Sequence, residues 1–246
     1  MFENVVPEYK IGWLQPTSVV DVAAYEFYRI APPRVMLVIL PLGLSEFSTE
    51  SSEEALAPLD EQIDQLVDRG VHMIVQSGVP APLLLGIEAH DRMIEHIATR
   101  SGLPATSTVL CVVRSAVHLG IKKLAMANVW DSQMNKTLVK FFARGQVEIG
   151  GAATKAMQHD EFVKLSGADQ LTLAYELGRR AFLENPACDG LYLGGGSWPA
   201  EPVAVQLEQE FGRPVISHRA AMVRHSLQLL NAWRPVPGHG RLFALE

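Results

Sequence analysis

The sequence has few cysteines, no basic cluster and no long apolar run. Two cysteines, Cys111 and Cys188, cannot form a disulfide framework, and this favours a cytoplasmic location. Lysine and arginine number 21 against 27 acidic residues, so the net charge is −6, which argues against a nucleic-acid partner. The longest uninterrupted apolar run, Val35 to Leu40, is too short to cross a membrane, and the first residues lack the features of a signal peptide. We therefore expect a cytoplasmic protein without membrane contact.

Several motifs that would indicate a cofactor, a metal or a serine nucleophile are also missing. The stretch "GGGSWP" lacks the last glycine of a dinucleotide loop, and no G-K-[ST] follows it. His90 and His96 lie on one predicted helix without the spacing of H-E-x-x-H, so a solvated helix face is the interpretation favoured for both. No G-x-S-x-G occurs. We expect neither a metal nor an organic cofactor.

Apolar runs of strand length alternate with amphipathic, charged stretches along the whole chain. Strands are predicted in "KIGWLQPTS", "RVMLVILPL", "GVHMIVQSG", "KKLAMANVW" and "DGLYLGGG". Helices are predicted in "IEAHDRMIEHIATRSG", "DSQMNKTLVKFFARG", "GADQLTLAYELGRRAFLEN" and "AEPVAVQLEQEFG", and a single helix is predicted over 51–69. This alternation predicts an α/β protein with mainly parallel strands, because crossover helices must cover both faces of the sheets.

A weak internal repeat predicts two similar halves. "GLPATSTVLCVVR" and "GRPVISHRAAMVR" share G-x-P-x-x-S and a later V-R, and each follows a glycine loop, "VQSGVPAP" or "YLGGGSWP". We expect two pseudo-symmetric lobes, the first formed by residues 1–118 plus 219–246 and the second by 119–218. Ligands of open α/β sheets bind beyond the carboxyl ends of the strands, so both glycine loops would face one cleft between the lobes. Chance similarity is the alternative.

The two glycine loops are candidates for holding an anion through backbone N–H groups. Ser77, Gly78 and Val79 form the first loop; Gly194, Gly195, Gly196 and Ser197 form the second. Such a nest of amides with one hydroxyl suits a carboxylate or an oxyanion. A tight strand-to-helix turn without a ligand is the alternative.

The chain resembles the arylmalonate decarboxylases and maleate cis-trans isomerases of the aspartate/glutamate racemase superfamily. The similar stretches, in order, are "IGWLQP", "PLGL", "GLPATST", "LGIKKLAMANVWDSQMN", "DGLYLGGG", "GRPVIS" and "PGHGRLF". The resemblance implies two pseudo-symmetric α/β lobes with the active site between them. It also adds Pro16, at the end of "IGWLQP", to the candidate substrate-binding residues.

The chain departs from this family at positions that carry its chemistry. The resemblance places Gly78 and Gly195 where the family has one or two catalytic cysteines. Val79 stands where the decarboxylases offer a hydroxyl, and Trp130 where the family has a tyrosine. Cys111 lies in an apolar stretch and Cys188 precedes its strand, so neither thiol is expected at the cleft. Direct transfer of the family's mechanisms is therefore unsafe.

His218 is the candidate for proton transfer in place of the missing thiol. It follows Ser217 at the end of "RPVIS", and Arg219 beside it could clamp a carboxylate. The alternative is that His218 caps the next helix while Arg219 points to water. The sequence favours a lyase or isomerase acting on a small carboxylate, with decarboxylation slightly ahead. A carboxylate-binding protein without catalysis and a histidine-dependent hydrolase or hydratase remain open, as does a homo-oligomer.

Overall fold

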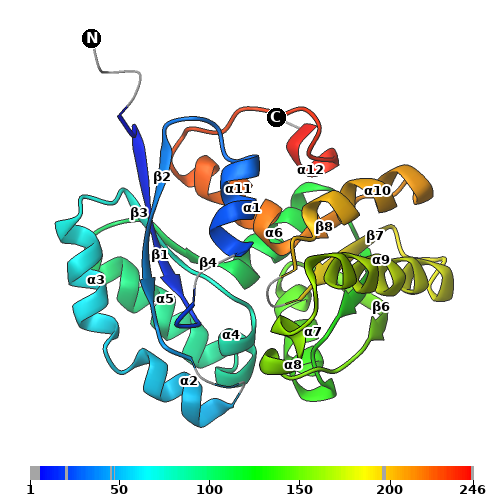
Figure 1. Cartoon of the computed structure of the whole chain (residues 1–246), viewed down its shortest axis with the longest axis horizontal. Helices are drawn as coiled ribbons and strands as arrows, with labels where there is room; N and C mark the ends of the chain where they lie inside the picture. Colours follow the sequence, from blue (N-terminus) through cyan, green and yellow to red (C-terminus); the bar gives the residue numbers. More distant parts are fainter. Residues whose placement is uncertain (1–5, 20–21, 45, 47, 196–197, 245–246) are drawn as a thin grey trace.

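The chain folds into two four-stranded parallel sheets flanked by helices (Figure 1), which confirms the predicted α/β class. The computed structural model describes residues 6–19, 22–44, 46, 48–195 and 198–244. The first sheet has the strand order β2-β1-β3-β4 and the second the order β6-β5-β7-β8. The strands are β1 (Tyr9–Gln15), β2 (Val35–Pro41), β3 (Met73–Gln76), β4 (Ala105–Ser107), β5 (Lys123–Asn128), β6 (Glu148–Thr154), β7 (Gly190–Gly194) and β8 (Val215–Ser217).

The two sheets repeat the same topology. In each, the first strand along the chain pairs on one side with the second strand and on the other side with the third, which pairs with the fourth. The internal repeat of the sequence thus corresponds to a repeated arrangement of strands. The boundaries 1–118 plus 219–246 and 119–218 stay a prediction.

Alternation along the strands of the first lobe separates two apolar cores. Ile11 and Trp13 of β1 join the large core that continues into the second lobe. Leu14 of β1 and Ile74 of β3 instead join a smaller core with Ile63 of α3. Successive side chains of a strand point to opposite faces, so the apolar runs of β1 and β3 need cover on both faces of the sheet.

Helices supply that cover. They are α1 (Val22–Ile30), α2 (Thr49–Leu56), α3 (Leu59–Asp68), α4 (Pro80–Leu85), α5 (Ile87–Ser101), α6 (Thr108–His118), α7 (Ser132–Arg144), α8 (His159–Val163), α9 (Gly167–Glu184), α10 (Glu201–Phe211), α11 (His218–Leu229) and α12 (Arg241–Ala244). The single helix predicted over 51–69 is wrong: α2 and α3 are separated at Ala57 and Pro58. A proline interrupts an α-helix because it lacks the N–H and clashes with the preceding turn.

Helices α6 and α11 follow the last strand of each sheet and pack against each other at the centre of the molecule (Figure 1). In addition, α6 packs on α7 and α11 packs on α1. Hydrogen bonds connect α6 and α11: Arg114 Nη1 lies 2.7 Å from His225 Nε2, Arg224 Nη2 lies 2.8 Å from His118 Nε2, and the Thr108 hydroxyl lies 3.7 Å from the sulfur of Met222. The carboxyl ends of both sheets therefore face this central pair of helices.

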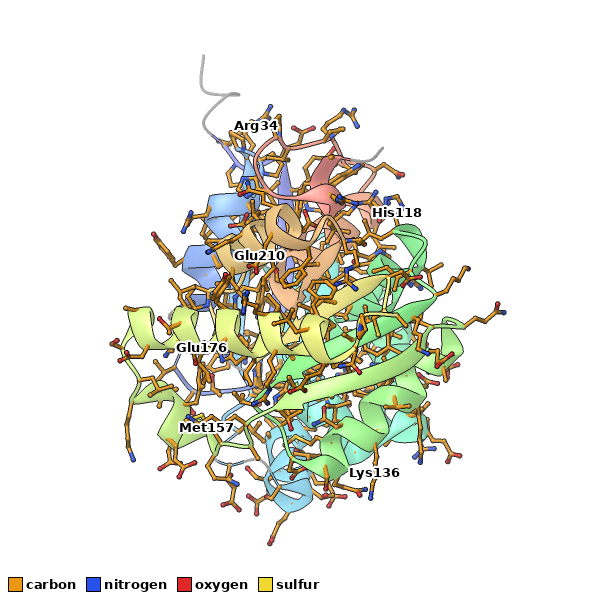
Figure 2. The ribbon with its side chains drawn as sticks, turned by 90° about the vertical axis from the view of Figure 1, so that its right-hand side faces the viewer. Arg34, His118, Lys136, Met157, Glu176 and Glu210 are labelled. Carbon is orange, nitrogen blue, oxygen red and sulfur yellow. The ribbon has the colours of Figure 1, made fainter. Side chains whose placement is uncertain are left out.

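The C-terminal segment holds α10 through two buried glutamates. His239 Nδ1 lies 2.9 Å from Glu201 Oε1, and the Arg241 N–H donates to Glu208 Oε2 at 2.8 Å. On the outer side of α10, Glu210 accepts hydrogen bonds from Tyr175 and Arg179 of α9; Figure 2 faces this side, with Glu210 on α10 above α9. His239 and Arg241 belong to the "PGHGRLF" stretch, so this stretch holds α10, the helix that follows the second glycine loop, in place.

Among the helices formed by the described residues, none combines the length and the apolar character needed to cross a membrane.

Candidate active site

The candidate residues lie where the carboxyl ends of the two sheets meet α6 and α11. Ser77 and Gly78 follow β3, Gly195 follows β7, and His218 follows β8. Thr108, the first residue of α6, connects the two halves of the site. Its hydroxyl accepts a hydrogen bond from the Gly78 N–H at 3.1 Å and lies 3.7 Å from the sulfur of Met222 on α11.

The backbone conformation of the first loop requires a glycine at position 78. Its φ is +85°, a conformation that side chains rarely allow, and an added Cβ would lie 2.6 Å from Cγ of Pro16. Its N–H, which we predicted would bind a substrate carboxylate, donates to Thr108 instead. Val79 is buried and precedes α4, whose first residue is Pro80. The first loop thus places Pro16, Ser77 and Val79 together but has little free hydrogen-bonding capacity at Gly78.

The second loop is filled by tryptophan. An added Cβ at Gly195 would lie 2.3 to 2.6 Å from Cε2, Cδ2 and Nε1 of Trp198. At Gly194 it would meet the rings of Trp130 and Tyr192, each at 2.7 Å. Both glycines are therefore needed for close packing of indole rings. Gly196 and Ser197, the other predicted anion-binding residues of this loop, lie outside the described residues.

Aromatic side chains with unpaired polar atoms surround this loop. Trp198 is fully buried and stacks on Phe162 with 5.9 Å between the ring centroids. The indole nitrogens of Trp130 and Trp198 and the hydroxyl of Tyr192 are buried without a hydrogen-bond partner among the described residues. Buried polar groups are nearly always paired, so three unpaired groups around one loop mark it as a candidate binding site.

The backbone at Trp130 is held in place by a pair of asparagines. The side chain of Asn128 donates to Asn135 at 2.7 Å and accepts the Trp130 N–H at 3.1 Å. Asn135 in turn donates to the carbonyl oxygens of Trp130 and Asp131. The indole of Trp130 is thus presented from a rigid turn between β5 and α7.

His218 is buried in a position suited to proton transfer. It is 5% exposed, no side chain among the described residues hydrogen-bonds its ring, and the backbone of Leu193 contacts the ring and favours its protonated form. Burial, and next the positive charge of Arg219, hold the pKa of His218 well below its ordinary value of 6.5, so the free site holds a neutral imidazole. Ser217, and not His218, caps α11, since its hydroxyl accepts the Ala220 N–H.

Arg219 has a different partner from the one we predicted. It is 4% exposed, so it does not point to water, and its Nε lies 2.7 Å from Oε2 of Glu26 on α1. The other carboxylate oxygen of Glu26 accepts the Glu201 N–H at 2.8 Å, at the start of α10. The N-terminus of α10 is thus occupied by a carboxylate of the protein itself. No pattern in the sequence of α1 indicates this role for Glu26.

Both cysteine thiols are buried. Cys111 is fully buried in α6, and burial raises its pKa to about 12. Cys188 precedes β7, at the opposite end of that strand from Gly195, and burial raises its pKa. The correspondence of Gly78 and Gly195 to the family's cysteines stays a prediction.

The interpretation of His90 as part of a solvated helix face is wrong. His90 is fully buried, with Nε2 2.8 Å from the hydroxyl of Ser107 and Nδ1 3.1 Å from Asp91. Its ring meets Phe141 edge to face. Burial lowers its pKa. His90 has charged neighbours in the sequence, so the local pattern does not predict its burial. That burial depends on the packing of α5 against α3, α4, α7 and β4.

The described residues contain no group of three or more histidine, cysteine or acidic side chains arranged to hold a metal ion.

Comparison with known proteins agrees with this architecture. Arylmalonate decarboxylase of Bordetella bronchiseptica is 23% identical over 212 residues, which cover 86% of this chain and 87% of that protein. A crystal structure of arylmalonate decarboxylase superposes with a TM-score of 0.79 and 22% identity, covering 95% of this chain and 98% of the other. A maleate cis-trans isomerase mutant from Nocardia farcinica, with a covalently bound succinylcysteine intermediate, has a TM-score of 0.82 and 20% identity, covering 97% and 99%.

A sequence profile for arylmalonate decarboxylase matches residues 20–243. That range contains both glycine loops, Trp130 and His218. The chain therefore belongs to the arylmalonate decarboxylase family.

Proposed function

We propose that this protein is a cofactor-independent enzyme that decarboxylates a small malonate-type acid with an aryl or alkyl substituent. Family membership supports the class of reaction, since the similar proteins are an arylmalonate decarboxylase and a maleate isomerase. The observation that carries the proposal is His218, a buried histidine at the carboxyl end of β8 whose ring is hydrogen-bonded by no side chain among the described residues.

His218 supplies the proton that the family resemblance assigns to a thiol. A bound carboxylate places negative charge next to the imidazole, and this opposes the charge of Arg219 and favours the protonated form. When the carbon–carboxyl bond breaks, its electrons stay on the substrate as an enediolate and CO₂ leaves. The imidazolium then transfers its proton to the α-carbon, and the neutral imidazole regains a proton from water.

The unpaired indole N–H groups stabilise the enediolate. Trp130 and Trp198 donate from a buried, apolar environment, where a hydrogen bond to developing negative charge is stronger than in water. Phe162 and Tyr192 pack against these indoles and make the site suitable for an apolar or aromatic substituent. Gly195 lets the chain approach Trp198 without a side chain of its own.

A deuterium experiment tests the proposal. Phenylmalonate and alkylmalonates incubated with the protein in D₂O are followed by proton NMR for loss of CO₂ and for one deuterium at the α-carbon. We expect His218→Gln to lower the rate at least about 100-fold, the usual loss for a general acid. His96→Gln is the matched control, because His96 is half exposed on α5 and bonds Asp60.

Circular dichroism of each variant shows whether it is folded, so that a loss of activity is not confused with a loss of structure. A folded His218→Gln protein that turns over at the wild-type rate would overturn the assignment of His218. Conversion of maleate to fumarate, without malonate decarboxylation, would assign the protein to the isomerases.

A second candidate is a carboxylate-binding protein without turnover. Trp198 fills the side-chain space at Gly195, and the Gly78 N–H and the α10 N-terminus already have partners within the protein. Such a protein is stabilised against heat by carboxylates but incorporates no deuterium into them.

A further inference from the structure

Glu26 forms a buried ion pair with a residue far from it in the sequence. It lies on α1, whereas Arg219 is the second residue of α11 and Glu201 is the first residue of α10. The Glu26 carboxylate is bound by Nε of Arg219 at 2.7 Å and by the Glu201 N–H at 2.8 Å. The side chains of Glu26 and Arg219 are 3% and 5% exposed. Helices α10 and α11 therefore build a carboxylate-binding position, and a side chain of α1 fills it.

The chemistry of this position is that of an anion site. A guanidinium and a helix N-terminus both favour a carboxylate, and the 11-residue helix α10 directs its positive end toward it. Burial raises the pKa of Glu26, and the charge of Arg219 opposes that rise. The Glu201 carboxylate faces away, toward His239. A substrate carboxylate placed here would have to displace Glu26 or lie beside its negative charge.

No other buried guanidinium among the described residues is free to replace Arg219. Arg224 is the second buried arginine, and its Nε donates to the carbonyl oxygen of Leu242 at 2.9 Å while Nη2 lies 2.8 Å from His118. Its guanidinium also lies over the ring of Trp233. Among the described residues, the buried guanidinium next to His218 is that of Arg219, and it lies against the Glu26 carboxylate.

We propose that Glu26 is a specificity residue that occupies a carboxylate position made by Arg219 and the α10 N-terminus, and so excludes vicinal dicarboxylates whose second carboxylate would have to bind at this position. This inference rests on the proposed function, because Glu26 can act as a specificity residue only if the protein binds small carboxylates. It predicts that a vicinal dicarboxylate such as maleate binds weakly to the wild-type protein. It also predicts that a free carboxylate enters the position when Glu26 is shortened.

Chemical rescue tests the position directly. Glu26→Ala removes the carboxylate but keeps Arg219 and the α10 N-terminus, so formate should raise the melting temperature of this variant more than chloride at equal ionic strength. The matched control is Glu26→Gln, which fills the same volume without charge and should respond to formate no more than to chloride. Maleate should bind Glu26→Ala about tenfold more tightly than the wild type, as expected for a charge-assisted contact regained.

The readouts separate this inference from the proposed function. Rescue by formate needs no turnover, so it can succeed even if no malonate is decarboxylated. Equal effects of formate and chloride on Glu26→Ala overturn the carboxylate position, and equal affinity of wild type and variant for maleate overturns the role in specificity. If Glu26→Ala folds poorly, it is refolded in formate and in chloride; a higher yield in formate supports the proposal, and equal yields, including none in either salt, contradict it.

Discussion

Gly195 and Trp198 should be energetically coupled, and the coupling can be measured. An added Cβ at Gly195 would lie 2.3 Å from the Trp198 ring, closer than any normal contact. The φ of Gly195 is outside the left-handed region, so alanine is tolerated by the backbone and the strain arises from the ring alone. Overpacking of this kind costs about 2 kcal/mol in the free energy of unfolding.

Removing the ring removes the clash. Trp198→Ala by itself should cost about 4 kcal/mol, because a fully buried indole leaves a large cavity. In that background Gly195→Ala should cost close to nothing, so the double variant loses about 4 kcal/mol and not the additive 6 or so. The predicted coupling is therefore about 2 kcal/mol in favour of the double variant.

Urea unfolding of the wild type, both single variants and the double variant gives the four free energies of this cycle. Gly167→Ala is the control, because no atom lies within 4 Å of its added Cβ and its effect should not depend on Trp198. An equal cost of Gly195→Ala in the presence and absence of Trp198 would refute the packing argument. It would also imply that the side-chain space at this loop is open to a ligand.

Two further predictions concern titrating groups. Burial, followed by the charge of Arg114, lowers the pKa of His225 from 6.5 to about 4, so the unfolded chain binds more protons between these values and stability falls as pH falls through them. By about pH 4.5 this group alone should cost about 2.5 kcal/mol, and urea unfolding of His225→Gln should show a weaker loss between about pH 7 and 4.5; the same slope as wild type would contradict it. Iodoacetamide should label neither Cys111 nor Cys188 in the native protein and leave turnover unchanged, since both thiols are buried with raised pKa values. Rapid labelling with loss of turnover, followed by mass spectrometry, would show a reactive thiol at the site.

The sequence alone was sufficient for the architecture. Apolar runs of strand length separated by amphipathic stretches predicted parallel sheets, because only crossover helices can connect such strands. The internal repeat predicted two similar halves, and the structure repeats the same strand order. The helices predicted in "IEAHDRMIEHIATRSG" and "AEPVAVQLEQEFG" are α5 and α10, and each ends at a glycine in the left-handed conformation.

Side-chain partners were decided by the tertiary structure. Arg219 was expected at a substrate carboxylate and binds Glu26, and His90 was expected at a solvated face and lies buried against Ser107. Trp198 fills the space beside Gly195, which the sequence left open to a ligand. Periodicity within an element predicts which face is buried, but the neighbour that a buried group meets depends on how distant elements pack. For Glu26 and Arg219, that neighbour comes from a helix far away in the sequence, which no local pattern encodes.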